Sequence, residues 1–256
     1  MAYEHIIYET LGPVARIWHN RPAQRNAEGT QLLDELDQAL QEALDDAGVK
    51  VIIIAGKGDQ FSAGHDIKEG LALRGNQTVE ERYAYEERRY YDYCLRIWDA
   101  PKPTIAQVHG ACIAGAFMLA NMCDLLVASE DAYFADPVVK GFGAAATEVL
   151  VHPWVLGLRK AKYMLYTGKP ISAKEGYDIG LVSELVPRAE LEAATLALAE
   201  IIAQAPAMAL KLTKRALNRT ADIQGFRNAL NAHFDTHQLS HATEAMRTAL
   251  GAKKGG

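Results

Sequence analysis

The sequence predicts an α/β fold with a mostly parallel sheet. Three short apolar runs, at 51–55, 104–108 and 125–128, alternate with helical segments. Strands separated by helices pair in parallel, and the helices cover the faces of the sheet. The chain has 256 residues, of which 49% are hydrophobic. One large domain with a sizeable core is therefore expected.

The first elements of the chain are predicted to be a hairpin followed by a helix. Residues 6–8 and 14–18 are the expected strands, because each is apolar and a Gly-Pro turn lies between them. Leucines recur on one face of the next segment, which predicts a helix over 28–46. Asn26 is the expected N-cap of this helix.

The rest of the chain is predicted to be mainly helical. A tyrosine-rich helix is expected at 80–98, after a glycine-rich loop. Amphipathic patterns and caps predict further helices at 158–167, 172–179, 189–204, 206–218 and 223–250, with a short strand at 182–186. We expect a core formed by residues 1–190 and a C-terminal helical region formed by residues 191–256.

The net charge, the apolar runs and the cysteines indicate which kinds of partner and site are not expected. The net charge of −5 disfavours a nucleic-acid partner, and no apolar run reaches membrane-spanning length. The N-terminus has no basic leader of the kind found in signal peptides. Cys94, Cys112 and Cys123 lie in apolar or helical contexts without metal-binding spacing, so we expect reduced thiols, no metal site and a cytoplasmic location.

The stretch 108–124, VHGACIAGAFMLANMCD, is a turn of small residues that leads directly into an apolar helix. Gly110, Ala114, Gly115 and Ala116 leave the backbone of the turn accessible. Free N–H groups at a helix start suit a phosphate, a carboxylate or a developing oxyanion. Tight packing of a helix on a sheet through small residues is the alternative interpretation.

Other motifs accompany this stretch in a characteristic order. NRPAQRNA (20–27) and FSAGHDIKEG (61–70) precede it, and YFADP (133–137) follows it. This ordered set resembles the crotonase family, the enoyl-CoA hydratase/isomerase superfamily, over nearly the whole chain. The resemblance implies a crotonase-type ββα spiral core with a C-terminal helical trimerisation region, assembled as a homotrimer or hexamer.

The resemblance also implies the substrate class and part of the site. The expected substrate is an acyl-CoA thioester, whose carbonyl oxygen is held by the backbone N–H groups of His65 and Gly115. No covalently bound cofactor is expected, because coenzyme A enters as part of the substrate. The coenzyme A path is expected along Arg25, Ala27, Ala63, Asp66 and Ile67.

The sequence departs from the family at both usual catalytic glutamates. By motif position these are Met118 and Val138, and neither side chain carries a proton. Both would instead form an apolar floor for the acyl group. Glu148 is the best remaining proton carrier, with His152 on the same helix face at i+4. Burial among apolar neighbours is expected to raise the pKa of Glu148.

Two functions follow from these observations. The first is an enzyme of the hydratase/isomerase family that stabilises a thioester enolate, by isomerase or hydrolase chemistry rather than by two-glutamate water addition. The second is a non-catalytic acyl-CoA binder that keeps the N–H pair and lacks the proton-carrying groups. A structural pair formed by Glu148 and His152 is the alternative to a catalytic role for Glu148.

Overall fold

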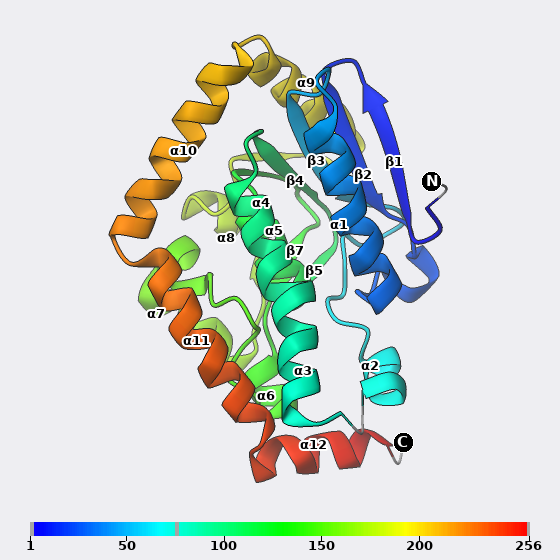
Figure 1. Cartoon of the computed structure of the whole chain (residues 1–256), viewed down its shortest axis with the longest axis vertical. Coiled ribbons are helices and arrows are strands. Elements are labelled where there is room, and N and C mark those ends of the chain that lie inside the picture. The colour runs from blue at the N-terminus through cyan, green and yellow to red at the C-terminus, as the bar shows by residue number, and fades with distance from the viewer. Residues whose placement is uncertain (1–2, 75–76, 255–256) are drawn as a thin grey trace.

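The computed structural model describes residues 3–74 and 77–254 and is built around a six-stranded sheet with the order β1-β2-β3-β4-β6-β9 (Figure 1). The strands are β1 (Ile6–Leu11), β2 (Val14–His19), β3 (Val51–Gly56), β4 (Thr104–Val108), β6 (Leu125–Ser129) and β9 (Glu184–Val186). β1 pairs antiparallel with β2, and the other neighbours pair in parallel. The predicted opening hairpin and parallel sheet are both confirmed.

The sheet is covered on both faces, which explains the unbroken apolar run of β3. Ile52 and Ile54 point into the main core with α1 (Thr30–Asp45). Ile53, on the opposite face, packs in a second cluster with Leu191 and Ala199 of α9 (Leu191–Ala203). The first helix of the expected C-terminal region is thus part of the core.

A second, three-stranded sheet was not predicted from the sequence. It contains β5 (Ala111–Ile113), β7 (Tyr133–Ala135) and β8 (Ile171–Ser172), in the order β5-β7-β8. Strands of two or three residues are too short to show an alternating pattern. This sheet draws the loop after β3 toward the 108–124 stretch, because Ser62 forms a parallel bridge with Cys112.

The remaining helices follow most of the predicted segments. They are α2 (Ile67–Arg74), α3 (Val79–Glu86), α4 (Tyr93–Asp99), α5 (Gly115–Met122), α6 (Val138–Phe142), α7 (His152–Thr167), α8 (Ala173–Asp178), α10 (Ala207–Ile223), α11 (Phe226–His241) and α12 (Glu244–Lys254). A π-helical turn at Glu87–Asp92 joins α3 to α4. Figure 1 shows α10 and α11 along one side of the molecule and α12 across one end.

Two predictions about the start of α1 are wrong. α1 begins at Thr30 rather than Glu28, and Asn26 does not cap it. The buried Asn26 amide instead donates to the carbonyls of Lys57, Gln60 and Phe61, which ties the two polar loops together.

The expected terminal helix over 223–250 is two helices. Gly225, with φ of +104°, precedes α11, and α11 ends before Ala242. The Thr243 hydroxyl accepts a hydrogen bond from the N–H of Met246 at 3.3 Å in the first turn of α12. α12 runs in a different direction from α11 (Figure 1).

In the described part of the chain, no single helix is long and apolar enough to cross a membrane. A bent pair, Arg188–Ala203 with Ala207–Ile223, reaches the required length and composition, but its two helices meet at 103°.

Candidate active site

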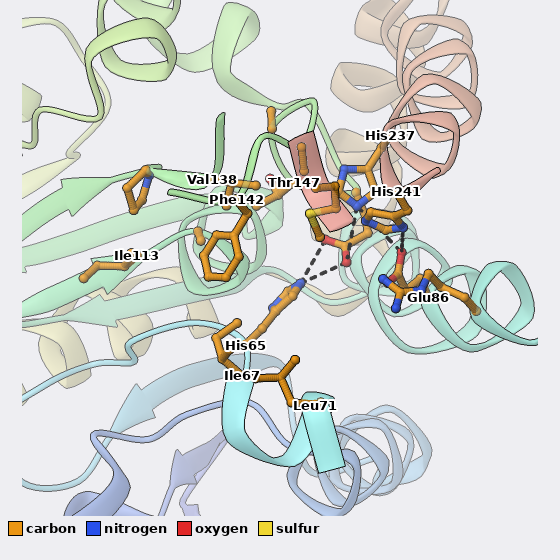
Figure 2. Close-up of a pocket in the computed structure, with 18 of the residues that line it drawn as sticks. His65, Ile67, Leu71, Glu86, Ile113, Val138, Phe142, Thr147, His237 and His241 are labelled. Atoms are coloured by element: carbon orange, nitrogen blue, oxygen red, sulfur yellow. Dashed lines mark hydrogen bonds and ion pairs between the residues drawn. The ribbon is translucent and has the colours of Figure 1, made fainter. Parts of the chain in front are cut away.

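A cavity of about 410 Å³ lies between the loop after β3, the start of α5 and the C-terminal helices. Its wall is largely apolar, and the polar side chains gather at one end (Figure 2). The lining includes Ala63, His65, Ile67, Leu71, Arg82, Glu86, Ile113, Ala114, Val138, Phe142, Thr147, Glu148, His237, His241, Met246 and Arg247. This combination of an apolar chamber and a few convergent polar groups is typical of a small-molecule site.

The backbone N–H groups of His65 and Gly115 lie where the loop after β3 meets α5. Gly64 allows the loop after β3 to lie close to the start of α5, because a Cβ on it would lie 2.4 Å from the Ile113 carbonyl and 3.2 Å from the Gly115 nitrogen. Ala114 enters α5 with φ of +52° and ψ of −110°. Across residues 3–74 and 77–254, neither N–H donates to a protein acceptor. Two unpaired N–H donors are therefore available here.

The His65 imidazole is held from three sides. Its Nε2 lies 2.9 and 3.0 Å from the two carboxylate oxygens of Glu148. Its Nδ1 lies 3.4 Å from Oε2 of Glu28, and its ring stacks on Tyr90 with centroids 3.8 Å apart. Glu28 and Glu148 are both almost fully buried. The structure thus places an imidazole between two buried carboxyl groups.

These three groups have different protonation preferences. Burial opposes the charged form of His65, but Glu148 and Glu28 outweigh burial and raise the pKa of His65 to about 10. Burial raises the pKa of Glu28 despite its contact with His65. Burial also opposes the charge on Glu148, but His65 outweighs burial and holds the pKa of Glu148 well below its usual range. At neutral pH the pair is an imidazolium beside a carboxylate.

The chain is similar to proteins of one known family. A profile for the family described as enoyl-CoA hydratase/isomerase matches residues 9–253. The chain belongs to the enoyl-CoA hydratase/isomerase family. A relative from Mycobacterium tuberculosis, EchA13, which is named as an enoyl-CoA hydratase, is 40% identical over 94% of this chain and 81% of its own length.

Solved structures named as enoyl-CoA hydratase or hydratase/isomerase are also similar to this chain. A probable enoyl-CoA hydratase from Mycobacterium smegmatis is 46% identical, with a TM-score of 0.88, over 93% of this chain and 94% of that one. An enoyl-CoA hydratase/isomerase from Xanthobacter autotrophicus is 35% identical, with a TM-score of 0.90, over 99% and 98% of the two chains. The expected crotonase-type α/β fold is confirmed.

The expected helix face shared by Glu148 and His152 does not exist. Glu148 lies in an irregular segment, 143–151, and His152 is the first residue of α7. Glu148 faces His65, whereas Nε2 of the buried His152 lies 3.1 Å from Oδ2 of Asp136. The expectation of a raised pKa for Glu148 is also wrong, because it omitted the neighbouring imidazolium of His65.

Met118 and Val138, the positions expected to correspond to the usual family glutamates, differ in environment. Val138, at the start of α6, lines the cavity. Met118 is buried in the main core and is not among the lining residues, so the expected apolar floor includes only Val138. Asp136 does not line the cavity either, and its Oδ1 accepts a hydrogen bond from the N–H of Val138 at 3.0 Å.

The residues expected to bind coenzyme A divide into two groups. Ala63 and Ile67 line the cavity, whereas Arg25, Ala27 and Asp66 do not. Asp66 pairs with Arg21 at 3.0 Å and accepts a hydrogen bond from the N–H of Glu69. The Arg25 side chain is exposed, and its carbonyl accepts a hydrogen bond from the N–H of Ala63.

The structure brings further polar residues to the site that were not singled out in the sequence: Glu86, His237 and His241 line the cavity, and Glu28 lies behind His65. Glu28 precedes α1 and looks like a first-turn acid, so only its burial against His65 distinguishes it. His237 and His241 share one face of α11 because they are spaced i, i+4, and this spacing was visible in the sequence. Their partner Glu86 lies about 150 positions earlier, and no local pattern connects it to them.

The raised pKa of His65 predicts a loss of stability at alkaline pH. The imidazole titrates near 6.5 when unfolded and at about 10 when folded, so its stabilising contribution is complete below about pH 6.5. The contribution is lost as the pH rises toward 10. Between about pH 7 and about pH 9, the free energy of unfolding in urea should therefore fall more for the native protein than for His65→Gln. Equal slopes for the two proteins would contradict the charged pair.

Proposed function

We propose that the chain converts acyl-CoA thioesters through an enolate, with the thioester oxygen bound by the N–H groups of His65 and Gly115. The single observation that carries this proposal is that these unpaired donors lie beside an apolar cavity that also contains the ionised Glu148. Preorganised donors stabilise charge where it develops, and an enolate places negative charge on the thioester oxygen.

Glu148 is the proposed proton carrier. Its carboxylate takes a proton from the acyl α-carbon, the electron pair of that C–H bond forms a double bond to the carbonyl carbon, and the carbonyl π pair moves onto the oxygen to give the enolate. Returning the proton to the γ-carbon of an unsaturated chain shifts the double bond, which one carboxylate can accomplish alone. This fits isomerase chemistry better than water addition, for which the family normally uses two glutamates.

His65 supports both parts of the proposed site. Its backbone N–H is one of the two donors, while its side chain fixes the Glu148 carboxylate at 2.9 Å. Stacking on Tyr90 and contact with Glu28 restrict the imidazole further. His65 is thus a positioning residue for Glu148 as well as a backbone donor.

Coenzyme A and the assembly complete the proposal. The thioester extends from the cavity past Ala63 and Ile67, with Arg25, Ala27 and Asp66 in the loops that shape its path. A homotrimer or hexamer is supported by apolar side chains exposed on the C-terminal helices. These are Ile201, Met208, Leu212, Leu217, Ile223 and Leu239. A cytoplasmic location stays a prediction, in keeping with three buried, unpaired cysteines.

Turnover and binding measured together test this function. The protein is incubated with crotonyl-CoA, a 3-enoyl-CoA and bulkier acyl-CoAs, while products are separated and binding is followed by calorimetry. Double-bond migration and exchange of an α-hydrogen for deuterium are expected. Tight binding without turnover or exchange would instead identify a non-catalytic acyl-CoA binder. Absence of thioester binding would overturn both functions.

A further inference from the structure

Three side chains at the polar end of the cavity have the arrangement of metal ligands. Glu86 is the last residue of α3, and His237 and His241 are one turn apart on α11. One donor atom from each residue lies within 4.8 Å of the other two. Figure 2 shows the two imidazoles and the carboxylate converging on one another beside the cavity.

The separations fit a bound ion better than direct hydrogen bonds. Oε2 of Glu86 lies 3.7 Å from Nε2 of His237 and 3.6 Å from Nδ1 of His241. These distances exceed those of good hydrogen bonds. Two ligands bound about 2.0–2.2 Å from a tetrahedral zinc ion lie about 3.3–3.6 Å apart. A modest contraction of the three side chains would therefore complete the coordination.

The histidines also have unused coordinating capacity. The ring centroids of His237 and His241 lie 4.5 Å apart and the ring planes are inclined at 78°, so the two rings approach the carboxylate from different directions. Nδ1 of His241, which lies 3.6 Å from Oε2 of Glu86, is buried and has no hydrogen-bond partner among the described residues. His237 is only 4% exposed. An unpaired buried nitrogen atom is costly, and a metal ion would satisfy Nδ1 of His241.

Residues around the three candidate ligands affect how an ion would be held. The Gln238 amide donates to Oε2 of Glu86 at 2.7 Å and fixes the carboxylate. All three candidate ligands line the cavity, so an ion held by them would border its interior. Oε1 of Glu148 lies 3.8 Å from Nε2 of His237 and adds negative charge. Arg82 and Arg247 line the same cavity, and their positive charges disfavour a bound cation. The negative charges of Glu86 and Glu148 offset this repulsion.

We propose that Glu86, His237 and His241 bind one divalent transition-metal ion of the zinc class at the border of the acyl cavity. Two imidazoles and a carboxylate suit Zn²⁺ or Co²⁺ and do not suit Mg²⁺, which prefers oxygen ligands. The proposal extends beyond the thioester chemistry, because the ion site stands whether or not Glu148 moves a proton.

Metal titration of the full chain tests the proposal. After treatment with a chelator and dialysis, ZnCl₂ is titrated in calorimetrically, and CoCl₂ is followed by visible absorption. We expect one Zn²⁺ per chain and no comparable heat with MgCl₂. His241→Ala and Glu86→Gln should each weaken Zn²⁺ binding by about 100-fold.

His233→Ala is the matched control on the same helix. Its Nε2 donates to the Thr147 carbonyl at 2.7 Å, and it lies outside the proposed ligand set. This variant should bind Zn²⁺ as tightly as the native protein, with circular dichroism confirming that all variants are folded. Failure of the native protein to bind Zn²⁺, or equal affinity in His241→Ala and Glu86→Gln, would overturn the metal site. Neither result depends on acyl-CoA turnover.

Discussion

Glu148→Gln is expected to lower kcat by about 10²–10⁴-fold on any acyl-CoA that the native protein converts. The amide keeps the size of the side chain but cannot accept the α-proton. The two N–H donors are backbone groups and remain in place, so thioester affinity should change little. Steady-state kinetics and calorimetry on the same preparation provide both quantities.

A surface variant controls for the chemistry of the substitution. Glu130 is exposed, and Glu130→Gln should leave kcat and binding unchanged. Thermal unfolding of Glu148→Gln must also be measured, because the variant removes the partner of the His65 imidazolium. If folded Glu148→Gln retains kcat within about tenfold of the native value, another group carries the proton.

Gly115→Ala should reduce kcat/KM by about 10²–10³-fold, the effect of losing one oxyanion donor. A Cβ at this position would lie 2.3 Å from both Oε2 of Glu28 and Nδ1 of His65. The methyl group therefore displaces the imidazole that positions Glu148, together with the loop that presents the second N–H. Overpacking of this kind costs about 1–3 kcal/mol in stability, measurable by urea unfolding.

Gly141→Ala provides the matched comparison. Gly141 lies in α6, and nothing is within 4 Å of its ideal Cβ position. This variant should keep full activity and gain up to about 1 kcal/mol from higher helix propensity. Equal activity of the Gly115→Ala and Gly141→Ala variants would show that the close approach at Gly115 has no role in the reaction.

The main strands and most of the helices could be predicted from the sequence, because the patterns that specify them involve residues close together in the chain. The apolar run of β3 must be buried on both faces, and α7 ends at Thr167 as predicted, followed by Gly168 with φ of +64°. The helix predicted at 172–179 is α8, and the Ser172 hydroxyl caps it by accepting a hydrogen bond from the N–H of Glu175 at 3.1 Å. Such elements depend on neighbours a few positions away.

The site was less predictable because it depends on contacts between distant segments. The ion pair of His65 and Glu148 joins residues 83 positions apart, and it reverses the expected pKa shift of Glu148. An expected helix face paired Glu148 with His152, but the segment is irregular. Small residues at 144–146 favour helix by composition, yet Ala146 adopts φ of +60°.

The irregular segment that bears Glu148 has a consequence for the evolution of the family. The N–H donors are fixed by strand bridges and the start of α5, whereas Glu148 belongs to a stretch without regular hydrogen-bonded structure. Mutations in this stretch can relocate or replace an acidic group at little cost to the strands. A lineage can thus change the position of its acidic group while the backbone that presents the two N–H donors stays unchanged.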